Sequence, residues 1–155
     1  EVTTKDDLFR FIVTWVEDRM MAAVPDDHPL LGGDSGCIKD RLFELFMARF
    51  DAMQEYRAGF IRLVDDTAGA VFRRGDACLA RTVALPILKA MGGVLTTVGV
   101  QTDGIKGKVK IASMTLVYIM SLRKWVKDES GDLGMTMAEL DHRLDQWLRV
   151  NDWVG

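Results

Sequence analysis

The chain has 155 residues, 48% of them hydrophobic and only 3 of them proline, with a formal net charge of −3. This composition excludes a generally disordered chain, and the slightly acidic balance argues against a protein that binds nucleic acid through its own surface. Because no apolar run approaches the roughly 18 residues of a membrane span and the two cysteines lack metal-ligand spacing, we expect one soluble, cytoplasmic domain spanning residues 1–155.

The first predicted helix starts at Thr4, because Thr4 and Asp7 have the spacing of a capping box. Apolar side chains then recur every three or four residues as far as Val24, just before Pro25. Two prolines and a pair of glycines follow, so residues 25–36 are predicted to be a loop.

The second helix is predicted to begin near Cys37, with Ser35 as a candidate cap, and to carry an apolar stripe as far as Met53. A third helix is predicted from Tyr56 to Val71. The stretch at residues 73–77 then breaks the helical pattern, and its Asp76 is a candidate cap for a fourth helix.

The fourth helix, from Leu79 to Val98, is apolar all round, which predicts a position in the middle of the domain. Pro86 falls in its interior and Gly92 and Gly93 follow, so a kinked central helix is expected. The alternative is that Pro86 starts a shorter helix after a break, since proline is well tolerated in a first turn.

A glycine-containing loop leads to a fifth helix, predicted from Val109 to Lys127. After a polar break, Thr136 and Glu139 have the spacing of a second capping box, which predicts a terminal helix packed antiparallel to the fifth. This hairpin makes half of a four-helix bundle, which a second subunit would complete, or alternatively it covers its own core. The predicted dimer-interface residues are Leu116, Met120, Met137, Leu140, Leu144 and Trp147.

No catalytic constellation is found in the sequence. His28 and His142 are the only histidines, and neither lies near a cysteine or serine or within a metal-binding motif. Paired carboxylates such as Asp65 and Asp66 are typical of solvated helix ends. We therefore expect a protein that is not an enzyme and that has no catalytic residues, no metal site and no cofactor.

Nine methionines and seven phenylalanines favour a soft apolar interior. Such a pattern is typical either of plain core or of a cavity for an apolar ligand, with Arg57 or Tyr118 as the polar group that orients it. The candidate pocket residues are Trp15, Phe46, Met53, Arg57, Phe60, Met91, Leu95, Met114 and Tyr118.

The order of about six helices, opening with "TTKDDLF" and ending with "WVKDESGD" and "TMAELDHRL", resembles the C-terminal regulatory domain of TetR-type transcriptional regulators. Thr4, Lys5 and Leu8 match a Ser/Thr-Lys-x-x-Leu stretch that follows the DNA-recognition helix in that family. The resemblance implies an all-α bundle that binds a small hydrophobic effector and forms a homodimer through its last two helices. It also implies a helix-turn-helix DNA-binding domain upstream of residue 1.

The stretch from Thr102 to Asp132 also looks like a TetR-fold accessory protein of ubiquinone biosynthesis, which binds isoprenoid lipid. That family has a richer aromatic signature where this chain has residues 104–107, and this departure makes lipid binding the second choice.

Overall fold

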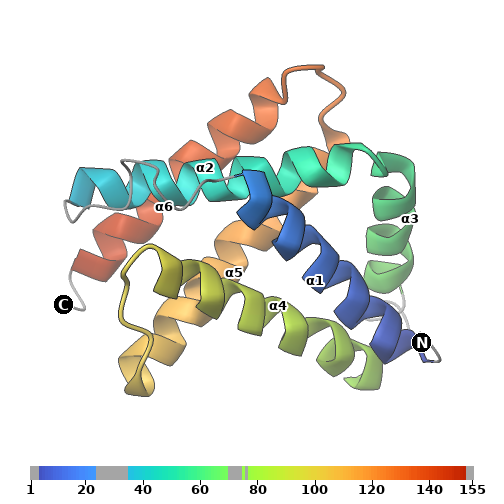
Figure 1. Ribbon diagram of the computed structural model, residues 1–155, viewed down its shortest axis with the longest axis horizontal. Coiled ribbons are helices and arrows are strands. Elements are labelled where there is room, and N and C mark those ends of the chain that lie inside the picture. The colour runs from blue at the N-terminus through green and yellow to red at the C-terminus, as the bar shows by residue number, and fades with distance from the viewer. Residues whose placement is uncertain (1–3, 24–34, 70–74, 76, 153–155) are drawn as a thin grey trace.

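The computed structural model describes residues 4–23, 35–69, 75 and 77–152. These residues form six helices and no strand, which confirms the expected all-α class with about six helices (Figure 1). The helices are α1 (Lys5–Ala23), α2 (Ser35–Gln54), α3 (Arg57–Ala68), α4 (Ala77–Thr97), α5 (Gly104–Lys127) and α6 (Gly134–Asp152).

The start of α1 confirms the predicted capping box. The backbone N–H of Asp7 donates to the Thr4 hydroxyl at 3.1 Å, and the backbone N–H of Thr4 donates to the Asp7 carboxylate at 3.0 Å. Both bonds satisfy donors that a helix end leaves without partners, and the carboxylate also complements the positive end of the helix dipole. The side chain of the proposed cap Ser35, the proposed cap Asp76, the loop at residues 25–34 and the predicted helix end at Val71 lie outside what the structure describes.

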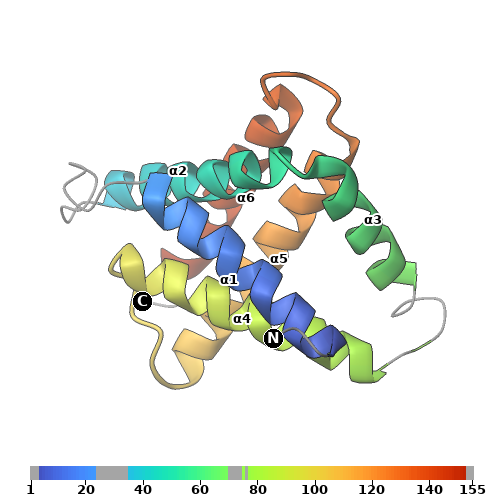
Figure 2. The ribbon, with the colours of Figure 1, turned by 45° about the vertical axis from the view of Figure 1, so that its right-hand side comes forward.

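Pro86 lies inside α4, which continues from Ala77 to Thr97, so the alternative of a break before Pro86 is wrong. The prediction that α4 lies in the middle of the domain was correct only for one side of its C-terminal half, where Met91, Val94 and Leu95 belong to the core, whereas Thr96 and Thr97 are exposed. In its N-terminal half Leu85 is exposed, because α4 packs there against α1 on one side only. Figures 1 and 2 both show α1 lying across this half of α4.

Helix α5 begins at Gly104, five residues before the predicted start, and Gly107 explains the difference. A Cβ on Gly107 would lie 2.0 Å from the backbone of Thr102, so only glycine lets the preceding loop pass over the first turn. Gly104 itself adopts a φ of 68°. Gly104 and Gly107, which suggested a loop in the sequence, therefore form the first turn of α5.

The predicted capping box at Thr136 is wrong. Both the backbone N–H and the hydroxyl of Thr136 donate to the carboxylate of Asp128 at 2.7 Å, and Glu139 instead pairs with Arg143. Asp128 also accepts hydrogen bonds from the backbone N–H and the hydroxyl of Ser130. The carboxylate of Asp128, just after the end of α5, thus replaces the predicted local cap. A charged acceptor at a helix N-terminus forms a stronger hydrogen bond than a neutral hydroxyl does.

The core lies where α2 crosses the α5–α6 hairpin and the C-terminal half of α4. Its centre is a run of stacked rings in which Tyr118 lies 5.9 Å from Phe46 and 6.1 Å from Phe50, and Phe50 lies 6.2 Å from Trp125. The guanidinium of Arg49, only 2% exposed, lies 5.0 Å from the centre of the Tyr118 ring. Such ring and cation contacts add to the stability that apolar burial provides.

Asp128 gives the stability of this fold a defined pH dependence. Burial alone would raise the pKa of its carboxyl, but hydrogen bonds from Ser130 and Thr136 outweigh this and lower the pKa from 3.8 to about 2. The stabilisation is therefore complete at about pH 5 and above, well clear of the unfolded-state pKa of 3.8, and is lost progressively as the pH falls towards 2. We predict that Asp128→Asn lowers the free energy of unfolding by about 2 kcal/mol at pH 7 in urea titrations.

The matched control is Asp132→Asn, because the exposed Asp132 carboxylate accepts only the backbone N–H of Gly134, at 3.2 Å, within the described part of the chain. We expect a loss below about 0.5 kcal/mol for this variant. The Asp128→Asn deficit should shrink between pH 5 and pH 2. An equal deficit at both ends of that range would contradict the assignment of the pKa shift.

Candidate functional site

Most of the predicted pocket residues lie in the closed core. Phe46, Met53, Met91, Leu95, Met114 and Tyr118 are all buried and pack against one another between α2, α4 and α5. Trp15 on α1 and Phe60 on α3 are only partly buried, and these two line a cavity. Of the nine predicted pocket residues, six therefore lie together in the core and two line a groove. The ninth, Arg57, is described below.

This α1/α3 groove has a volume of about 480 Å³ and takes one wall from each helix. Phe11, Ile12 and Trp15 come from α1, whereas Tyr56, Gly59, Phe60 and Leu63 come from α3 and the turn before it. A groove of this size with aromatic and aliphatic walls is typical of sites for small apolar ligands. Phe11, Ile12, Tyr56, Gly59 and Leu63 were missed in the sequence because nothing local indicates that α3 faces α1.

Charged groups near the groove are already paired with each other. Arg19 lies 5.1 Å from the centre of the Trp15 ring and forms an ion pair with Glu55 at 3.6 Å. A hydrogen bond to Glu55 is the largest effect that raises the pKa of Tyr56, so the Tyr56 hydroxyl stays protonated at neutral pH. Trp15 and Tyr56 meet edge to face at 5.5 Å. The groove therefore offers one hydroxyl and apolar surface, which favours an uncharged ligand.

Arg57 is the first residue of α3, and this N-terminal end of the helix is here called its root. The Arg57 side chain binds the end of α5 and does not point into the groove. Its Nη2 donates to the carbonyl of Trp125 at 2.7 Å and to that of Asp128 at 2.5 Å, and its guanidinium lies 4.6 Å from the centre of the Trp125 ring. These carbonyls are the acceptors that a helix end leaves without intrahelical partners. The residue predicted to orient a ligand is thus the C-terminal cap of α5.

Helix α3 is held mainly at this root. No residue of α3 is fully buried, and the helix rests on the core through half-buried side chains such as Phe60 and Ile61. Figures 1 and 2 show it at the edge of the molecule, descending from the end of α2. One wall of the groove is therefore a helix anchored at its first residue.

A second feature is an exposed apolar face on α5. From Ile105 to Ile119 the members of this α5 apolar face lie three or four residues apart, as one side of a helix requires, and Met120 adjoins Ile119. Ile105 is 84% exposed and Leu116 58% exposed. The face consists of Ile105, Val109, Ala112, Leu116, Ile119 and Met120.

Only two of the predicted dimer-interface residues, Leu116 and Met120, belong to the α5 apolar face. Met137 is half-buried, and Leu140 and Leu144 are fully buried against their own chain. Trp147 is also buried, and its indole N–H donates to the hydroxyl of Ser113 on α5 at 2.9 Å. The α6 stripe therefore covers the core of its own domain, and the face left outside belongs to α5.

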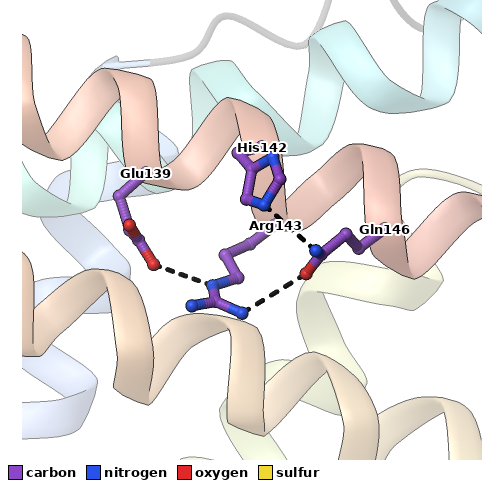
Figure 3. Close-up of polar contacts among 4 residues, drawn as sticks. All are labelled: Glu139, His142, Arg143 and Gln146. Carbon is purple, nitrogen blue, oxygen red and sulfur yellow. Dashed lines mark hydrogen bonds and ion pairs between the residues drawn. The ribbon is translucent and has the colours of Figure 1, made fainter.

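Polar side chains of α6 run along its junction with α5 (Figure 3). Arg143 donates to Glu139 at 2.7 Å and to Gln146 at 3.3 Å, and Gln146 lies 3.0 Å from the Nε2 atom of His142. These side chains are three or four residues apart on α6, so each hydrogen bond joins neighbours on the same side of the helix. His142 therefore takes part in a surface network on the helix.

The described residues contain neither a metal-binding cluster nor a membrane span. No group of three or more histidine, cysteine, aspartate or glutamate side chains in this part of the chain could hold a metal ion. None of its helices is long and apolar enough to cross a membrane. Comparison with protein-family models, curated proteins and solved structures finds no match to this chain.

The role of Arg57 as the C-terminal cap of α5 can be tested by replacing its guanidinium with an uncharged group. We predict that Arg57→Gln lowers the free energy of unfolding by roughly 2 kcal/mol, since it removes charged hydrogen bonds to carbonyl groups. Arg62→Gln, on the exposed side of the same helix, is the control and should change it by less than about 0.5 kcal/mol. Equal losses in urea titrations of the two variants would show that Arg57 is not a cap.

Proposed function

We propose that this chain is the effector-binding and dimerisation core of a TetR-type transcriptional regulator of the cytoplasm, which senses a small, uncharged apolar ligand. The position of α1 is the observation that carries the proposal. Phe11, Ile12 and Trp15 of α1 form one wall of the α1/α3 groove. In the family that residues 4–8 resemble, this same helix continues from the DNA-recognition helix. A ligand in the groove would therefore act on the helix that leads to the DNA.

The two walls of the groove are held in different ways, which suggests how a ligand would be sensed. Val16 and Met20 bury the C-terminal half of α1, whereas Leu8 and Phe11 in its N-terminal half are exposed. The opposite wall is fixed at its root by Arg57. A ligand that needs a wider groove would move the N-terminal half of α1 outward. It would shift the population of the two arrangements only if it binds one of them more tightly.

The α5 apolar face supports the dimer. Its residues from Ile105 to Met120 extend over about 22 Å of helix, and the polar face of α6 lies beside them. If two copies meet through this face, each supplies the antiparallel α5–α6 pair and together they form a four-helix bundle about a two-fold axis. An apolar face of this extent on a lone chain is typical of an interaction surface.

The dimer can be tested by placing a charge at the centre of the face. We predict that Leu116→Glu converts a dimer into a folded monomer in analytical ultracentrifugation, with the helical circular dichroism spectrum retained, because an unpaired carboxylate would be buried between the two subunits. Leu85→Glu is the matched control, since Leu85 is about as exposed as Leu116 but lies on α4, and it should leave the dimer intact. A wild-type chain that is monomeric at tens of micromolar would contradict the dimer.

The ligand groove can be tested with the uncharged dye Nile red. Gly59 lines the groove, and a Cβ placed on it would meet no atom within 4 Å, so a larger side chain there fills space without a clash. We predict that Gly59→Leu weakens Nile red binding at least tenfold in fluorescence titrations. Gly93→Leu, at an exposed glycine in α4 with the same free space, should leave the affinity unchanged. Equal affinities for both variants would exclude the groove as the binding site.

The apolar groove also favours one second candidate, a TetR-fold accessory protein that binds isoprenoid lipid for quinone biosynthesis. Its walls would suit a long apolar chain as well as a compact effector. Native mass spectrometry of the purified chain distinguishes the two functions. A dimer that is empty or carries a small adduct supports the regulator, whereas a monomer that carries a long-chain lipid supports the accessory protein.

A further inference from the structure

A larger cavity, of about 610 Å³, lies on the other side of α1. This α1/α4 cavity takes one wall from residues 10–17 of α1 and the other from residues 78–90 of α4. The two helices lie side by side there, with their first residues at the same end of the molecule (Figures 1 and 2). Unlike the α1/α3 groove, this cavity is strongly charged.

Three cationic side chains line the α1/α4 cavity, namely Arg10, Arg81 and Lys89. Within the described part of the chain, no hydrogen bond or ion pair engages any of them, although Arg19, Arg57 and Lys39 each have partners. A chain of net charge −3 thus places these three positive charges around one cavity. Their combined field would attract an anion.

The carboxylate of Glu17 also lines the cavity, but among the described residues it forms an ion pair with Arg49 and with none of these three cations. Glu17 lies 3.6 Å from Nη1 of Arg49, an α2 residue whose side chain is 2% exposed. Among the described residues, both Nε and Nη1 of Arg49 lack a hydrogen-bond partner, and no other carboxylate lies at ion-pair distance from this side chain. Glu17 therefore balances that buried charge, and the three cations of the cavity remain available to a ligand.

The rest of the cavity surface indicates what the ligand carries besides its charge. Val13, Leu85, Pro86 and Ala90 provide aliphatic surface, and the described lining residues include no aromatic side chain. Such a surface suits an alkyl or isoprenyl chain, whereas a nucleobase or another flat ring would find no ring to stack on.

The spacing of the cations indicates how the ligand would lie. Arg81 and Lys89 are eight residues apart on α4, which separates them by about 12 Å along the helix. Arg10 lies near the start of α1, Arg81 lies near the start of α4, and both line the cavity. Because the two helices begin at the same end of the molecule, we assign both cations to that end of the cavity. Two guanidinium groups from facing helices are suited to bind the oxygens of a phosphate or carboxylate group.

We infer that the α1/α4 cavity binds an aliphatic chain with an anionic phosphate or carboxylate headgroup. The headgroup lies between Arg10 and Arg81, and the chain runs over Leu85 and Pro86 towards Ala90. This site does not depend on the proposed regulator function, because it shares neither the α1/α3 groove nor the α5 apolar face. Its ligand would carry a negative charge, whereas the ligand proposed for the groove is uncharged.

Isothermal titration calorimetry with four probes tests the inference: octyl phosphate, octanoate, 1-octanol and inorganic phosphate. We expect octyl phosphate or octanoate to bind at least tenfold more tightly than 1-octanol and inorganic phosphate, because only these two carry both a charge and a chain. The tighter of the two identifies the headgroup. If 1-octanol or inorganic phosphate binds as tightly as both, or if no probe binds at 1 mM, the inference is overturned.

Variants locate the binding. Arg81→Gln should weaken binding of the tighter amphipathic probe at least tenfold, whereas Arg62→Gln on α3 should leave it unchanged. Circular dichroism spectra of both variants establish that they are folded, and Arg10→Gln provides a second test from the opposite wall. If Arg81→Gln and Arg10→Gln both bind as the wild type does, the cavity is not the site. Sedimentation of the same samples reports the oligomeric state separately.

Discussion

The structure depends on one junction at the end of α5, where Asp128 and Arg57 satisfy the ends of two helices at once. The backbone carbonyl of Asp128 accepts from Arg57, while its side chain accepts from Thr136 at the start of α6. A helix that ends inside a folded chain must find partners for its last carbonyls, and one that begins there must find partners for its first N–H groups. A single residue therefore fixes where α3 starts and how α6 returns against α5.

This junction joins three helices to the packed core. It holds the root of α3 and the α5–α6 hairpin together, and the stacked rings from Phe46 to Trp125 add the packed core beneath them. The N-terminal half of α1, where Leu8 and Phe11 are exposed, forms a wall of both the α1/α3 groove and the α1/α4 cavity. An uncharged ligand on one side and an amphipathic anion on the other would thus act on the same helix.

Local patterns in the sequence predicted local structure well. The hydrogen bonds between Thr4 and Asp7 span three residues, and the helix order follows from apolar periodicity, so both could be recognised without knowledge of the fold. The contact of Arg57 with Trp125 spans 68 residues, and no periodicity reports such a pair. Similarly, Asp128 displaced the predicted cap at Thr136 because a charged acceptor eight residues away was brought close by the turn.

The candidate sites were predicted only in part, because periodicity identifies an apolar face but not what covers it. The α6 stripe through Leu140 and Leu144 was correctly recognised as apolar, but it packs on its own chain. The α5 apolar face could be completed only once the helix was seen to start at Gly104, which adds Ile105 to it. Of the predicted pocket, Trp15 and Phe60 line a groove because α3 stands at the edge of the fold.

If the proposed function is correct, a ligand in the α1/α3 groove acts on the N-terminal half of α1 while the junction at Asp128 stays fixed. Hydrogen–deuterium exchange with and without saturating Nile red tests it most directly. We expect a changed exchange rate for the amides of residues 8–15 and an unchanged rate for residues 126–137. A change confined to residues 126–137, or no change in α1 despite bound dye, would contradict it.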